Sequence, residues 1–147
     1  MTESIFWFIM DMLDWNKQGD DEKVMAPAVR YLSKQSDEEI FDFSDIMAKL
    51  LYDIDSKKLA EKIYGKDDYF SGDEFLYTRC VALINGKDYY YAVKNGKKKL
   101  NRDLEFESIL YLPIDAWSKK HKKSPELYPH IAEYSYETGR NSELWEN

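Results

Sequence analysis

The group of residues that most resembles a ligand-binding site in this sequence consists of Asp73, Glu74 and Arg79. An arginine can bind an anion through its planar guanidinium group, and clustered carboxylates can hold a hard cation. The structural alternative is that Arg79 pairs with a polar neighbour inside an otherwise apolar helix, while the two acids stabilise the start of that helix. We keep ligand binding at these three residues as an alternative hypothesis.

Residues for covalent or metal-dependent catalysis are not grouped in the sequence. Cys80 falls on the apolar face of a predicted helix, where a thiol is an inert part of the core. His121 and His130 are the only histidines, and they lie in or beyond the lysine-rich end of another predicted helix, so we expect solvent around them. The sequence has no glycine-rich phosphate loop and no Cys/His spacing that suits zinc. We predict no catalytic residue, no metal site and no cofactor, and hence a protein that is not an enzyme.

The acidic residues are unevenly distributed along the chain, whose formal net charge is −7. Residues 1–93 carry 19 acids and 11 bases, a balance of −8, whereas residues 94–147 carry 9 acids and 10 bases, a balance of +1. An acidic surface repels nucleic acid and attracts basic proteins, although solubility alone also explains such a charge. We predict a protein-interaction domain with a basic protein partner, such as an immunity or inhibitor protein of a bacterial toxin. The predicted contact residues are Glu22, Asp42, Asp45, Asp53, Asp67 and Asp68.

Two lysine clusters support a different function. They lie within residues 94–99 and 119–123, and the aromatic side chains of the C-terminal segment offer surfaces on which bases can stack. We therefore keep a nucleic-acid-associated accessory domain as a second hypothesis. Against it, the rest of the chain is acidic, and lysines near helix ends are common because they interact favourably with the helix dipole.

The residues around Arg79 belong to the clearest helix of the sequence, over residues 71–86. Ser71 and Glu74 form a capping box, in which each side chain accepts a hydrogen bond from the backbone N–H of the other residue. Apolar residues then recur at spacings of three and four, which is typical of a helix face turned to a core. Asn85-Gly86 is a typical helix end, because glycine adopts the left-handed conformation without strain. We expect this helix to lie at the centre of the fold.

The other elements are also predicted to be helical. A strand is the alternative for the tyrosine-rich run 87–94, because Tyr and Val favour strands. The fold class that we predict is all-α, a single compact bundle of six or seven helices in a domain of residues 1–125, with residues 126–147 as an irregular C-terminal tail packed on it. The further predicted helices span about 3–18, 21–34 with a kink at Pro27, 37–54, 57–64, 89–93, and a segment capped by Asp103 that bends at Pro113 and reaches Trp117.

The N-terminal sequence and the cysteine content indicate the compartment. The opening MTESIFWFIMDML has no basic region and no small-residue cleavage site, so it is not a secretory signal. Its longest apolar run is too short to cross a bilayer. A single cysteine permits no internal disulfide, which suits a reducing compartment. We expect a cytoplasmic protein that does not act on a membrane.

Five motifs are shared with a known family. They are TESIFWFI at residues 2–9, SDEEI at 36–40, LLYDIDSKKLA at 50–60, GDEFLYTRCVALINGKDYY at 72–90 and SYETGRNSELW at 135–145. In this order they resemble the bacterial domain-of-unknown-function family numbered 4240, which occurs alone or beside a WGR domain. The resemblance covers nearly the whole chain, and the central block is its most specific part. It implies a small, mainly helical bacterial domain without an established activity, and it transfers no catalytic residue.

Overall fold

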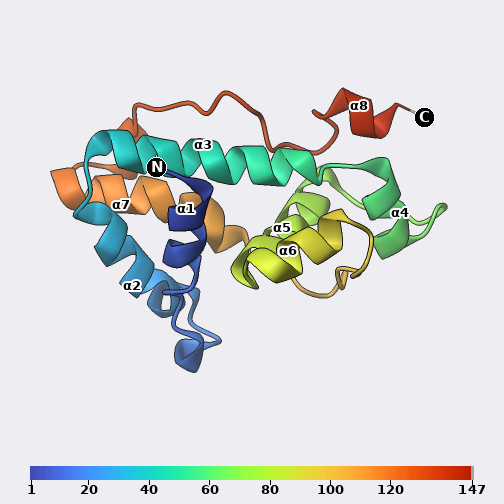
Figure 1. Ribbon diagram of the computed structural model, residues 1–147, viewed down its shortest axis with the longest axis horizontal. Coiled ribbons are helices and arrows are strands. Elements are labelled where there is room, and N and C mark those ends of the chain that lie inside the picture. The colour runs from blue at the N-terminus through green and yellow to red at the C-terminus, as the bar shows by residue number, and fades with distance from the viewer. Residues whose placement is uncertain (147) are drawn as a thin grey trace. The chain divides into compact units, whose positions relative to one another are not determined.

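The computed structural model describes residues 1–146 and shows an all-α protein (Figure 1). Within this range it contains eight α-helices, three short 3-10 helices and no strand, so the predicted fold class is confirmed. None of the helices in this part of the chain is long and apolar enough to span a membrane. The α-helices are α1 (Glu3–Met10), α2 (Asp21–Ser33), α3 (Asp37–Asp53), α4 (Lys57–Tyr64), α5 (Gly72–Ile84), α6 (Lys87–Lys94), α7 (Leu112–His121) and α8 (Ser142–Trp145), and the 3-10 helices are η1 (Trp15–Lys17), η2 (Glu107–Tyr111) and η3 (Pro125–Leu127).

The helices belong to two compact units. Unit 1 consists of Met1–Met47 and Ser108–Glu133, and unit 2 consists of Ala48–Glu107 and the chain from Tyr134 onward. Helix α3 contributes its first part to unit 1 and its last part to unit 2. The predicted division into a helical domain and a C-terminal tail stays a prediction.

The core of unit 1 is built from α1, α2, α3 and α7. Val24, Ala28 and Leu32 recur every four residues along α2, and each is 0% exposed, as expected for one buried helix face. The ring of Phe6 on α1 packs against that of Phe43 on α3, with 4.8 Å between the ring centroids. Each large apolar side chain buried in this way stabilises the fold by about 1.5–3 kcal/mol. Helix α7 adds the buried side chains Leu112, Pro113, Ala116 and Trp117.

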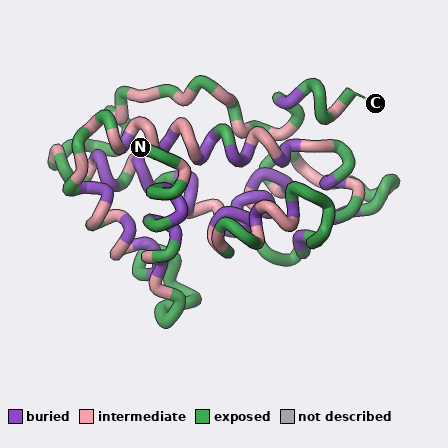
Figure 2. The backbone as a smooth tube through the Cα atoms, viewed as in Figure 1, coloured by how far each residue is buried: buried purple, intermediate pink, exposed green. Residues whose placement is uncertain are grey.

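Helix α5 contributes many buried residues to unit 2, and its position at the centre of the whole fold stays a prediction. Both hydrogen bonds of the Ser71–Glu74 capping box are present at its start, and Gly86 at its end has a left-handed φ of 92°. Helix α6 follows, so the tyrosine-rich run is helical, and the Tyr90 hydroxyl donates to the carbonyl oxygen of Leu50 at 2.5 Å. Figure 2 shows that most of α5 is buried; its buried residues are Phe75, Leu76, Thr78, Arg79, Cys80, Val81, Ala82 and Leu83.

The first helix is shorter than predicted. It ends at Met10 instead of continuing to Gln18, and the chain turns into the 3-10 helix η1. The Asp14 carboxylate accepts the N–H of Asn16 at 3.1 Å, and the Asp14 N–H donates to the carbonyl oxygen of Val24 at 2.9 Å. These bonds use the backbone and side chain of Asp14 outside a helix, which is the usual way in which an aspartate competes with helical hydrogen bonding.

The predicted helix from Asp103 with a bend at Pro113 is also wrong. Helix α7 begins at Leu112, so Pro113 lies in its first turn, where the missing N–H leaves no hydrogen bond unmade. The 3-10 helix η2 comes directly before α7, and residues 104–106 are irregular and are held on α5. Phe106 donates its N–H to the Tyr77 carbonyl at 3.1 Å, and Thr78 donates its hydroxyl to the Leu104 carbonyl at 3.1 Å.

Candidate functional site

Helices α2 and α7 of unit 1 border a groove of about 860 Å³. The two helices run in the same direction (Figure 1). Near their starts, the Ser108 hydroxyl donates to Asp21 at 3.3 Å, and near their ends, Lys120 donates to the carbonyl oxygen of Gln35 at 2.9 Å. The groove therefore follows two parallel helices and has two distinct ends.

The groove is lined by a second face of α2, beside the face that enters the core. Residues 22, 25, 26, 29 and 30 line it, at the spacings of three and four that place side chains on one side of a helix. Residues 111, 114, 115 and 119 have a similar spacing on the opposite wall. The apolar lining residues are Met25, Ala26, Val29, Tyr111, Ile114 and Pro125.

Two carboxylates, Glu22 and Asp115, lie at the end of the groove where both helices begin. Each is in the first turn of its helix, where the dipole favours a negative charge. Both residues are exposed, but the pKa of Asp115 is nevertheless raised, first because neighbouring atoms partly desolvate the carboxyl group and second because Glu22 is negatively charged. Within residues 1–146, no ion pair or hydrogen bond to a cation neutralises either carboxylate. This end of the groove is therefore suited to a cation.

Two cations, Arg30 and Lys119, line the groove farther along the same helices. Both side chains are exposed. No ion pair with a carboxylate engages either of them in the described part of the chain. The groove thus has an apolar floor, a negative end and a positive end, which is the composition of a binding site with a few oriented polar groups.

Of the acids predicted to contact a partner, Glu22 lines this groove, whereas Asp42 and Asp45 are engaged within unit 1. Asp42 accepts a hydrogen bond from the N-terminal amine of Met1 at 2.7 Å, and this bond raises the pKa of the amine. Asp45 is 2.8 Å from Nε2 of His130. A partner of Asp42 or Asp45 would have to compete with these internal contacts.

The other predicted contact residues belong to unit 2. Asp53 forms an ion pair with Lys49 at 2.5 Å, and Asp68 lies 3.3 Å from Arg102. Asp67 is exposed on the loop before α5. A contact surface that includes these three residues stays a prediction.

The expectation that both histidines face solvent is wrong. His121 Nε2 lies 2.8 Å from Asp37 Oδ1. The His130 ring stacks on Phe41, with centroids 4.9 Å apart and planes inclined by 13°. His121 therefore holds the end of α7 on α3, and His130 holds the segment after α7 there. These contacts join residues more than 80 positions apart, so local sequence does not reveal them.

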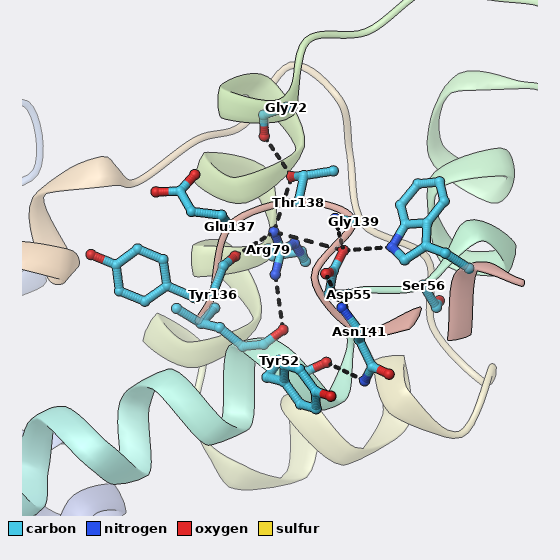
Figure 3. Close-up of polar contacts among 12 residues, drawn as sticks. Tyr52, Asp55, Ser56, Gly72, Arg79, Tyr136, Glu137, Thr138, Gly139 and Asn141 are labelled. Carbon is cyan, nitrogen blue, oxygen red and sulfur yellow. Dashed lines mark hydrogen bonds and ion pairs between the residues drawn. The ribbon is translucent and has the colours of Figure 1, made fainter. Parts of the chain in front are cut away.

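Arg79 is buried in the core of unit 2 (Figure 3). It is 0% exposed. Its guanidinium donates to the carbonyl oxygen of Leu51 at 2.9 Å, to that of Tyr136 at 2.8 Å and to the hydroxyl of Thr138 at 3.1 Å. Burial lowers the pKa of Arg79, and the negative charge of Asp55, 4.0 Å away, opposes that effect. These contacts are those of a structural arginine.

Asp55 connects the end of α3 to the C-terminal segment (Figure 3). It is 0% exposed, and its carboxylate accepts the backbone N–H of Gly139 at 3.1 Å and that of Asn141 at 3.2 Å. The indole N–H of Trp145 donates to it at 2.7 Å. A buried carboxylate needs such donors, because without them its burial would strongly destabilise the fold.

Asp73 and Glu74, the other residues of the alternative ligand site, serve the start of α5. Glu74 accepts the Ser71 N–H at 3.4 Å and lies 3.8 Å from Arg102, and Asp73 is exposed. In the described chain, no hydrogen bond or ion pair joins either acid to Arg79. Ligand binding by these three residues stays a prediction.

Cys80 is buried, and each lysine cluster contains a side chain with a partner in the folded chain. Burial raises the pKa of the Cys80 thiol to about 12, so the thiol stays protonated, as expected for a core cysteine. In the second lysine cluster, Lys120 pairs with Asp37 at 2.7 Å. In the first, Lys98 lies over the ring of Tyr89, with 4.8 Å to the ring centroid. The nucleic-acid hypothesis is not tested by these contacts.

The residues that sequence reasoning missed lie in the groove and in the C-terminal segment. Asp115, Arg30 and Lys119 become part of one site only because α2 and α7 pack side by side. The four-residue spacing of Asp115 and Lys119 was visible in the sequence, but it is equally typical of an ordinary exposed helix face. Asp55 and Thr138 were missed because their partners are distant in sequence.

These features define a class: a small all-α protein with an apolar groove that is negative at one end and positive at the other. The chain belongs to the family described as "Protein of unknown function (DUF4240)", which matches residues 1–119. The predicted resemblance to this family is thereby confirmed, over a range that includes the first four motifs and not the motif at residues 135–145. No curated protein and no solved structure matches the chain.

Proposed function

We propose that this chain is a non-enzymatic protein-interaction domain, and that it binds a basic protein by placing a cationic side chain against Glu22 and Asp115. The observation that carries the proposal is the pair of carboxylates at the end of an apolar groove, with no cation of the described chain to neutralise them. Desolvation is the first cause of the raised pKa of Asp115, and repulsion from Glu22 is the second; a lysine or arginine of a partner would offset that repulsion.

The distribution of charge between the units supports a basic partner for unit 1. Unit 1 contains 14 acids and 8 bases, a balance of −6, whereas unit 2 contains 14 acids and 13 bases, a balance of −1. Most of the net charge of −7 therefore belongs to the unit that contains the groove. A surface with a net charge of one sign accelerates association with a partner of the opposite charge and disfavours partners of the same charge.

An immunity or inhibitor protein that neutralises a basic bacterial toxin in the cytoplasm is the form of this function that we favour. Such a protein needs a stable scaffold and fast, tight binding, and it needs no catalytic group. The charge balance and the groove are consistent with these requirements. The raised pKa of Asp115 is consistent with such a role, because perturbed carboxylates are often found at functional sites.

Affinity purification of the tagged full chain from its native host tests the proposal. We would compare the wild type with Glu22→Gln/Asp115→Asn. The control is Glu38→Gln/Glu133→Gln, which removes the same charge from exposed residues of unit 1 outside the groove. We expect a stoichiometric basic protein with the wild type and the control, and at least about a tenfold loss with the groove variant. Recovery of the same protein by all three chains would contradict the role of the groove, and recovery of no protein would contradict the proposed function.

A further inference from the structure

We infer that the α2–α7 groove binds one helical segment of the partner, with a Lys or Arg of that segment against Glu22 and Asp115 and an Asp or Glu against Arg30 and Lys119. This inference rests on the proposed function. It adds the positive end of the groove, which a partner with basic side chains alone would not contact. The partner segment is therefore recognised by two opposite charges separated by apolar residues.

The distance between the two ends of the groove sets the spacing of those charges. On α2, Glu22 and Arg30 are eight residues apart, which corresponds to about 12 Å along a helix. On α7, Asp115 and Lys119 are four residues apart, or about 6 Å. The charges of the bound segment are thus separated by one to two helical turns, which places them about four to eight residues apart on one face.

The floor of the groove requires apolar side chains between those charges. Val29 and Ile114 are half-buried in the free chain, and Tyr111 is 46% exposed. Covering this surface supplies most of the affinity, whereas exposed charge pairs supply little affinity and mainly select the partner and its orientation. Both contributions come from the same narrow strip between the helices.

A helix fits this strip better than the other kinds of occupant. Side chains at spacings of three and four along α2 and α7 form ridges, and a third helix can pack its own side chains between such ridges. The phosphates of a nucleic acid would meet the negative end formed by Glu22 and Asp115. A second copy of the chain is an alternative occupant that the experiment below distinguishes.

The test uses three fluorescent, hydrocarbon-stapled helical peptides of about 14 residues, or four turns. All three have the same leucine and alanine face, and they differ only at two positions seven residues apart, which carry Lys and Glu, two Lys, or two Glu. Binding to the full chain is measured by fluorescence anisotropy at physiological salt. Shifts of the backbone amide NMR signals of Val29 and Ile114, with none at Leu144 of unit 2, would place the peptide in the groove.

For the wild type, we expect the Lys/Glu peptide to bind about tenfold more tightly than either other peptide. Arg30→Glu/Lys119→Glu should shift the preference to the peptide with two Lys, and Glu22→Lys/Asp115→Lys should shift it to the peptide with two Glu. The control Glu38→Lys/Glu133→Lys, outside the groove, should keep the preference of the wild type. The reversal of preference distinguishes groove binding from loss of folding, since an unfolded variant gains no new preference.

Three results would overturn the inference. If the wild type prefers the peptide with two Lys, the negative end alone selects the partner, and the proposed function survives without the second charge. If none of the peptides binds, the groove does not accept a helix, and affinity purification still decides the proposed function separately. If sedimentation shows a dimer of the wild type that Glu22→Gln/Asp115→Asn dissociates, the occupant is a second copy of the chain.

Discussion

Asp115 on α7 has a raised pKa because neighbouring atoms partly desolvate its exposed carboxyl group and because Glu22 on α2 brings a second negative charge to the same end of the groove. Both residues occupy the first turn of a helix, a position that ordinarily stabilises a negative charge. The raised pKa therefore means that desolvation and repulsion together outweigh the favourable interaction of the carboxylate with the helix dipole. A cation brought by a partner would remove the repulsion, so this pair links the stability of unit 1 to its proposed binding function.

The first prediction concerns the pH dependence of this pair. A carboxyl group with a raised pKa binds its proton more tightly in the folded than in the unfolded chain, so the free energy of unfolding falls as the pH rises through that pKa. Asp115→Asn removes this effect. We expect the stability of Asp115→Asn relative to the wild type to increase between about pH 4 and pH 7, by no more than about 1 kcal/mol because solvent screens the pair.

Urea denaturation of both chains across this pH range measures the difference. Carbon-detected NMR titration of the Asp115 carboxyl group provides a second measurement, in which Glu22→Gln should lower the pKa of Asp115. A stability difference that is constant with pH, together with an unchanged pKa in Glu22→Gln, would show that the two carboxylates do not interact.

The second prediction concerns the buried Arg79. Arg79→Met removes three hydrogen bonds and leaves the Asp55 charge without its cation in the core. Removing one partner of a buried ion pair destabilises a protein by about 3–5 kcal/mol. Chemical denaturation should show a loss of this size, whereas Arg102→Met, at a side chain that is 40% exposed, should change stability by about 1 kcal/mol or less. Full stability of Arg79→Met would instead favour the alternative that Arg79 is kept for a ligand.

The third prediction concerns the attachment of the C-terminal segment to Asp55. Asp55→Asn keeps the shape of the side chain but replaces one carboxylate oxygen with an NH2 group. That group cannot accept the hydrogen bonds that the surrounding N–H groups donate to Asp55. We expect a loss of about 2–3 kcal/mol, since hydrogen bonds to a charged group are among the stronger ones. Hydrogen exchange should accelerate at the amides of Gly139 and Asn141. The neighbouring Asp53→Asn breaks only an exposed ion pair and should leave that exchange unchanged.

The fourth prediction concerns acid unfolding of unit 1. The pKa of Asp37 is lowered by Lys120 and then by His121, which both bond to its carboxylate. A lowered pKa gives a stabilisation that is complete above the pKa of the unfolded chain and is lost as the pH falls through the folded value. Below about pH 4, the wild type should therefore lose stability faster than Asp37→Asn. Parallel acid titrations of the two chains would contradict this linkage.

The elements that follow from short-range hydrogen bonding could be predicted from the sequence. The capping box of Ser71 and Glu74 and the glycine at position 86 define the ends of α5 because the atoms involved are only a few residues apart. The end of α1 was not predictable in the same way. It depends on the bond from Asp14 to Val24, which forms only once α2 has folded back on that loop.

The candidate site was predictable only in part. The sequence indicated an acidic protein and selected Glu22, but it did not pair that residue with Asp115, which is 93 positions away. Arg79 was recognised as unusual, yet its partners Tyr136 and Thr138 come from a segment with no regular pattern. Residues brought together by tertiary packing leave no periodic signal in one sequence, whereas caps and helix faces do.

Site-specific photocrosslinking in the native host tests the central claim most directly. The full chain would carry the crosslinker p-benzoylphenylalanine in place of Tyr111, in the groove, or in place of Tyr69, which is 86% exposed outside it. We predict that the groove position crosslinks to one basic protein, that Glu22→Gln/Asp115→Asn abolishes the adduct, and that the Tyr69 position gives none. The same adduct from both positions, or an adduct that persists without the two carboxylates, would contradict the binding of a basic partner at the α2–α7 groove.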